Sequence, residues 1–197
     1  NFVYDWVMKK LLGILVLGLL LITPSLADDV RDLQIEGMSI GDSALNYFSE
    51  VEINNGVQDY YKNKKFTDSE IIGLPQFKEY QSIHINFKTN DNNYMIYAIE
   101  GTILFKENIK DCYKKKDKIV KEVSKIFTSA KKKDVGITEH SYDKSGESIT
   151  TDVWFYLKSG IVSVSCYDWS TKMGFADHLR IRILSEEFDK FLTNDAY

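Results

Sequence analysis

Apolar and polar residues alternate through most of the second half of the chain, and this pattern restricts the fold to one built on a sheet. Ile83, Ile85 and Phe87, for example, alternate with polar residues, as in a strand with one buried face. Six segments carry the pattern: 80–88, 94–105, 136–143, 147–157, 161–170 and 176–184. Because strands joined by short turns pair antiparallel, we expect an α+β fold with a mostly antiparallel sheet of about six strands.

One long helix, residues 109–132, interrupts the strands and should pack across one face of the sheet. Its apolar residues, from Ile109 to Ala130, recur at spacings of three and four, which places them on one side of a helix. Asn108 is a suitable N-cap, and the lysines at 131–133 suit the negative end of the helix dipole.

The remaining elements are shorter. Short helices are expected near 42–50 and 186–192, the second one capped by Ser185. Residues 54–79 show weak periodicity, so no regular structure is expected there.

Two turns set the expected register of the strands. A polar turn at residues 89–93 should pair Ile85 with Tyr97. A two-residue turn in the later hairpin should pair Phe155 with Val164. In both hairpins the apolar residues then share one face.

Residues 1–27 are expected to lie outside the folded domain. Two lysines after Met8 precede an uncharged apolar stretch, and Ser25 and Ala27 form a small-x-small cleavage site. This is the organisation of a secretory signal peptide, and the apolar stretch is shorter than the roughly 20 residues that span a membrane. The residues before Met8 are interpreted as upstream translation. We therefore expect a soluble protein, exported to the periplasm and cleaved after Ala27.

The composition indicates one domain, residues 28–197, and argues against a nucleic-acid partner. The chain has 25 Lys and Arg against 29 Asp and Glu, a formal net charge of −4. Proteins that bind nucleic acids are usually basic, because much of their affinity comes from neutralising phosphates. The chain has only two prolines and no Pro-, Gly- or Ser-rich tract, so no linker is expected.

The two cysteines, Cys112 and Cys166, are expected to form a disulfide between the long helix and the sheet. Cys112 lies on the apolar stripe of the helix, and Cys166 lies on the apolar side of its strand. In an oxidising compartment an even number of cysteines favours a bridge over a metal site. Two buried free thiols are the alternative. His84, His140 and His178 stand singly, so we expect surface positions and neither a metal site nor a cofactor.

Residues 41–45, Gly-Asp-Ser-Ala-Leu, resemble the opening block of the GDSL (SGNH) hydrolases. In that family the serine is the nucleophile, so the resemblance implies a catalytic Ser43. The family's base motif has an aspartate three residues before the histidine, whereas Asp177 and His178 are adjacent here. A serine without a base is a weak nucleophile. We therefore expect Ser43 to cap a helix, and we assign no catalytic residue.

A larger part of the chain resembles a family of small, uncharacterised exported proteins from AT-rich bacterial genomes. The shared features are the segment 35–43 with Leu45 and Phe48, the stretch 60–66, and the helix that carries Cys112. The resemblance implies export and no particular activity.

Two surfaces are candidates for binding. Trp154, Tyr156, Tyr167 and Trp169 should share the outer face of one hairpin, where another element covers them or they form a recognition surface. The lysine-rich helix 109–132 is either a solvated face or a contact to an anionic membrane. We expect a non-enzymatic binding or interaction module with a protein or small-molecule ligand. The alternatives are a peripheral envelope-associated factor with weak membrane-surface contact, or a GDSL-like hydrolase.

Overall fold

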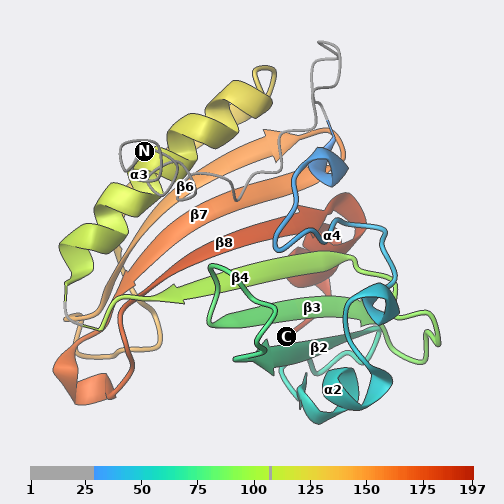
Figure 1. Ribbon diagram of the computed structural model, residues 1–197. Helices are drawn as coiled ribbons and strands as arrows, with labels where there is room; N and C mark the ends of the chain where they lie inside the picture. Colours follow the sequence, from blue (N-terminus) through green and yellow to red (C-terminus); the bar gives the residue numbers. More distant parts are fainter. Residues whose placement is uncertain (1–28, 107) are drawn as a thin grey trace, which may run out of the picture.

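The computed structural model describes residues 29–106 and 108–197, and an eight-stranded antiparallel sheet forms its centre (Figure 1). The order of the strands across the sheet is β1-β2-β3-β4-β8-β7-β6-β5. The strands are β1 (Val57–Gln58), β2 (Phe66–Ile72), β3 (Ser82–Lys88), β4 (Ala98–Leu104), β5 (Lys131–Glu139), β6 (Ile149–Leu157), β7 (Gly160–Asp168) and β8 (His178–Ser185). The α+β class and the antiparallel sheet are confirmed, but the sheet has eight strands and not about six. The signal peptide predicted at residues 1–27 lies outside the described residues.

Three α-helices and three short 3-10 turns complete the described part of the chain. They are η1 (Val30–Asp32), η2 (Ala44–Asn46), α2 (Glu50–Asn55), α3 (Ile109–Ile126), η3 (Thr171–Met173) and α4 (Glu186–Asn194). The short helix predicted near 42–50 is therefore wrong in detail, because this region holds a 3-10 turn and the α-helix begins at Glu50.

One face of the sheet carries the main hydrophobic core. The helix α3 packs on this face over β7 and β8, and the segment 29–48 covers more of the same face, with η1 against β7 and β8 (Figure 1). The core joins Val123 of α3 and Phe127, which directly follows this helix, to the inward side chains of the strands, such as Val164 and Ile183. Each such buried side chain contributes about 1.5–3 kcal/mol to folding.

A covalent bond fastens α3 to this core. Cys112 and Cys166 form a disulfide with a Cα–Cα distance of 6.1 Å, and both residues are fully buried. The predicted pairing is confirmed, because the apolar stripe of the helix and the apolar side of β7 meet at one interface.

The opposite face of the sheet is covered in part by α4. Phe188 and Phe191 of this helix pack on Phe66 of β2, with ring centroids 5.1 and 4.9 Å apart. The Ser185 hydroxyl accepts a hydrogen bond from the Phe188 amide, so the predicted cap of this helix is confirmed. The polar residues of β8 on this face therefore lie beside a second, smaller core.

The predicted end of the long helix is wrong. The helix α3 ends at Ile126, and Lys131–Lys133 belong to β5. All nine residues of β5 are exposed, because this strand pairs only with β6 at the edge of the sheet. The strand predicted at 136–143 covers only the second half of β5. An edge strand with two solvated sides shows little apolar alternation, and lysines are typical of such edges.

Residues 54–79, expected to be irregular, contain β1 and β2. The strand β2 pairs with β3 over its full length, from Phe66 with Lys88 to Ile72 with Ser82. The sequence of β2 shows no clear strand pattern, because the buried residues of this strand include the polar Asp68 and Ser69. Polar side chains that pack inside the molecule remove the contrast on which the period-two pattern depends.

Both predicted registers are displaced by two residues, so the same faces are kept. Ile85 pairs with Ile99 and not with Tyr97, because residues 94–96 bond to the N-terminal segment instead of β3. In the later hairpin Phe155 pairs with Val162, not with Val164.

Candidate functional site

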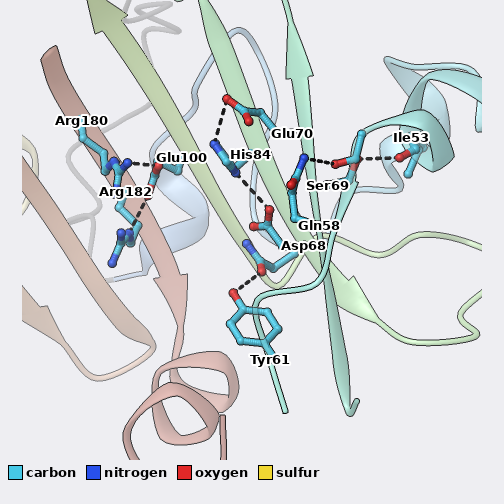
Figure 2. A network of polar contacts seen from close by, with 12 residues as sticks. Ile53, Gln58, Tyr61, Asp68, Ser69, Glu70, His84, Glu100, Arg180 and Arg182 are labelled. Atoms are coloured by element: carbon cyan, nitrogen blue, oxygen red, sulfur yellow. Dashed lines mark hydrogen bonds and ion pairs between the residues drawn. The ribbon is translucent and has the colours of Figure 1, made fainter. Parts of the chain in front are cut away.

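A row of charged side chains crosses the face of the sheet that α4 partly covers. The pairing of the strands brings Glu70 of β2, His84 of β3, Glu100 of β4 and Arg182 of β8 into one line. Residues directly opposite each other on neighbouring strands project from the same face. The sheet therefore collects acids and bases from four strands into one cluster (Figure 2).

His84 lies between two carboxylates. Its Nδ1 is 3.0 Å from Oδ1 of Asp68, and its Nε2 is 3.3 Å from Oε1 of Glu70. The Nδ1 contact is a hydrogen bond and the Nε2 contact is an ion pair, and the imidazolium form, which has a donor on each nitrogen, fits both. Burial lowers the pKa of His84, but the hydrogen bonds to Asp68 and Glu70 outweigh burial and raise the pKa to about 10.

Glu100 lies between two arginines. Its Oε1 is 2.8 Å from Nε of Arg180, and its Oε2 is 2.8 Å from Nε of Arg182. Only the Arg182 contact has the alignment of a hydrogen bond. Glu100 is only 7% exposed. Burial raises the pKa of Glu100, but the two guanidinium groups outweigh burial and lower the pKa to about 2.

A cavity of about 210 Å³ lies over this cluster, between the sheet and α4. Its lining residues are Tyr60, Tyr61, Asp68, His84, Asn86, Ala98, Ile99, Glu100, Arg180, Arg182, Leu184, Phe188, Leu192 and Tyr197. Ala98 explains the space, because it lies in register between Asn86 and Leu184 and has only a methyl group. The Tyr61 hydroxyl donates to Oδ1 of Asn86 at 2.7 Å, which fixes one wall (Figure 2).

Several polar atoms of this lining are free. Within residues 29–106 and 108–197, the two outer nitrogens of Arg182 have no hydrogen-bond partner, and neither does Oδ2 of Asp68. The Arg182 side chain is 28% exposed, so its outer nitrogens are accessible to solvent and to a ligand. The cavity therefore offers donors on the β8 side and an acceptor on the β2 side.

The predicted aromatic surface lies elsewhere and is divided into two pairs. Trp154 and Tyr156 stack with ring centroids 6.2 Å apart, and Tyr167 and Trp169 stack at 6.1 Å. Trp154 pairs with Ser163 in the ladder, which places the two aromatic pairs roughly 13 Å apart along the hairpin. Tyr156 is 37% exposed and the other three are half-buried. None of the four lines the cavity, and their role as a binding surface stays a prediction.

The prediction that the Ser43 side chain caps a helix is wrong. The Ser43 hydroxyl donates to the Asn93 carbonyl at 2.6 Å, and it makes no capping bond to η2. A backbone carbonyl cannot take a proton from a nucleophile, so this contact gives the GDSL-like interpretation no support.

The expectation that the histidines lie on the surface is wrong for two of them. His178 is buried beside Tyr167, with ring centroids 4.5 Å apart, and His84 lies in the charged cluster. The described part of the chain holds no group of three or more His, Cys, Asp or Glu placed to bind a metal ion. In the sequence, the charged residues of β4 and β8 alternate with apolar ones like those of a solvated face, so pattern alone did not reveal this site.

Comparison with known proteins adds no relative, because no protein-family model, curated protein or solved structure matches the chain. No helix among the described residues is long and apolar enough to cross a membrane.

The three histidines should titrate far apart. Burial lowers the pKa of His140 and of His178, whereas that of His84 is raised to about 10. In proton NMR, we expect one imidazole to stay charged beyond pH 8 while the other two are neutral at pH 7. The stability that His84 contributes is full below its ordinary pKa near 6.5 and lost as the pH rises towards 10. His84→Gln assigns the resonance, and a His84 midpoint near 6.5 would disprove the charged cluster.

Proposed function

We propose that this protein is an exported, periplasmic, non-enzymatic binding protein, and that it holds a small polar molecule in the cavity beneath α4. One observation carries the proposal: a cavity is lined by paired charged side chains that still keep atoms free of hydrogen bonds to the described residues. A ligand in the cavity can add charge-assisted hydrogen bonds to the free atoms of Arg182 and Asp68.

The titration of the cluster favours binding over catalysis. General acid–base catalysis works best with groups whose pKa lies near the working pH. Here the pKa of His84 is about 10 and that of Glu100 is about 2. Both groups hold their charge across the neutral range, which suits a fixed electrostatic environment for a ligand.

Two independent features support export. The predicted signal peptide directs the chain out of the cytoplasm, and the disulfide between Cys112 and Cys166 is typical of an oxidising compartment.

Filling the cavity should abolish ligand binding. Ala98→Met puts a long apolar side chain into the space that the alanine methyl leaves open, whereas Ala98→Ser keeps it open and serves as the matched control. We expect ligand-observed NMR with a library of carboxylates, amines, amino acids, phosphates and monosaccharides to give binders. These should be lost in Ala98→Met and retained in Ala98→Ser. Circular dichroism checks that both variants fold. A library without binders, or equal binding to Ala98→Met, would refute the proposed function.

The envelope-associated role is a second candidate, because α3 presents a basic ridge. Five exposed lysines lie on its solvent side at spacings of three and four: Lys110, Lys114, Lys118, Lys121 and Lys125. Anionic lipid attracts each such residue by about 1 kcal/mol. One of the five, Lys114, is already paired with Asp111 at 2.9 Å. Adsorption to anionic vesicles that weakens as salt rises would favour this role.

A further inference from the structure

The cavity offers opposite charges on its two sides, and we infer that its ligand is a small zwitterion that carries one ammonium and one carboxylate group. The inference rests on the proposed function and specifies the chemistry of the same site. It follows from the free atoms of the lining, the charge balance of the cluster and the size of the space.

The β8 side of the cavity is suited to a carboxylate. Arg182 uses only Nε to bind Glu100, and its outer nitrogens point away from Glu100 (Figure 2). These two nitrogens lie side by side in a plane, the arrangement that binds the two oxygens of a carboxylate. Arg180 lines the same side, and its guanidinium lies 4.6 Å from the Tyr167 ring centroid.

The β2 side is suited to an ammonium. The Asp68 side chain is only 5% exposed, and His84 occupies just one of its oxygens. The second oxygen has no partner among the described residues, and Asp68 lines the cavity. A carboxylate oxygen that has no donor in the protein and is accessible from a cavity can accept a charge-assisted hydrogen bond from an ammonium group. Tyr60 lines the cavity as well, and an aromatic ring is compatible with a nearby ammonium.

Charge balance favours a ligand with no net charge. The cluster contains three carboxylates, Asp68, Glu70 and Glu100, and three cations, Arg180, Arg182 and the protonated His84. A simple anion or a simple amine would leave one unbalanced charge in a poorly solvated place, which is costly. A zwitterion places a charge of each sign against the opposite side and keeps the sum at zero.

The dimensions of the site favour a small molecule. The cavity of about 210 Å³ is smaller than the 300–1,000 Å³ or so of drug-sized pockets. Three strand spacings separate β2 from β8, which is about 14 Å between the backbones. Phe188 and Leu192 of α4 form an apolar roof over the cavity, which suits a short aliphatic part.

Isothermal titration calorimetry of the purified protein at pH 7 tests the inference with matched probes. The zwitterions are L-alanine, L-valine and γ-aminobutyrate. Propionate, isovalerate and butyrate lack the ammonium, and ethylamine, isobutylamine and propylamine lack the carboxylate. We expect at least one zwitterion to bind at least about tenfold more tightly than both of its analogues, which corresponds to about 1.4 kcal/mol.

Two variants separate the sides of the site. Asp68→Asn should remove the preference for the zwitterion over its carboxylate analogue, and Arg182→Gln should remove the preference over its amine analogue. Ala98→Met leaves all the charges in place and should abolish binding, so it covers the case in which a charge variant fails to fold.

The possible failures are distinguishable from those of the proposed function. Equal binding of a zwitterion and its carboxylate or amine analogue overturns the inference while a cavity ligand remains established. Absence of binding by all nine probes also overturns it. In that case the library experiment with Ala98→Met still decides independently whether the cavity binds other chemistry.

Discussion

Breaking the Cys112–Cys166 bond should lower the free energy of unfolding by about 4 kcal/mol. The bond closes a loop with a sequence separation of 54 residues, and releasing a loop of that length returns roughly this much conformational entropy to the unfolded chain. The effect should be large because the bond joins α3 to β7, and α3 covers the main core. The double variant Cys112→Ala with Cys166→Ala keeps two small apolar side chains in place of the sulfurs.

Urea unfolding followed by circular dichroism measures this loss, with and without reductant. We expect reductant to shift the midpoint of the wild-type protein and to leave that of the double variant unchanged. The unchanged midpoint is the control for any general effect of the reductant. If the oxidised wild-type protein and the double variant unfold at the same urea concentration, the bond does not stabilise this fold.

Neutralising Glu100 should cost about 3–5 kcal/mol of stability, the range for removing one member of a buried ion pair. Glu100 faces the Nε atoms of Arg180 and Arg182 at 2.8 Å each. Glu100→Gln keeps the shape of the side chain but leaves both guanidinium groups without their carboxylate. Thermal and urea unfolding give the change in stability.

A surface carboxylate is the matched control for Glu100. Glu187 also lies near two cations, 3.2 Å from Nζ of Lys65 and 3.2 Å from Nζ of Lys88, but its side chain is 41% exposed. Exposed pairs contribute only about 0–1 kcal/mol each, so Glu187→Gln should change stability little. Similar losses in the two variants would show that the cluster under α4 is solvated like a surface.

The acid dependence of stability should identify Glu100 as well. Its pKa is lowered to about 2 in the folded state, so its contribution is present above the ordinary pKa of about 4.3 and is lost as the pH falls towards 2. Wild-type stability should therefore drop over that interval, and Glu100→Gln should flatten the drop. A drop of equal size in the variant would assign it to other carboxylates.

Local patterns were sufficient for several parts of this protein. Three features depend only on neighbours along the chain: the apolar stripe of α3, the Ser185 cap of α4 and the alternation of residues in β7. Their prediction therefore required no knowledge of the strand topology. The disulfide was predicted for the same reason, because Cys112 and Cys166 lie on two periodic faces that each demanded burial.

The sequence patterns did not fully predict those elements whose surroundings are formed by residues far away in the chain. Residues 131–135 of β5 were missed because they form an exposed edge, and β2 was missed because its buried residues include the polar Asp68 and Ser69. The registers were displaced because residues 94–96 bond to the N-terminal segment, which no local turn rule anticipates.

The candidate site belongs wholly to the tertiary structure. Glu100 and Arg182 alternate with apolar residues in their strands, which by itself describes a face exposed to water. That face is partly covered for two reasons, both of which involve residues far apart in the sequence: β4 pairs with β8, and α4 packs against the sheet. The sequence determined which side of each strand is polar. Whether that side meets solvent or encloses a charged cavity depended on strand order and on the docking of the last helix, because burial is a property of the assembled layers and not of any one segment.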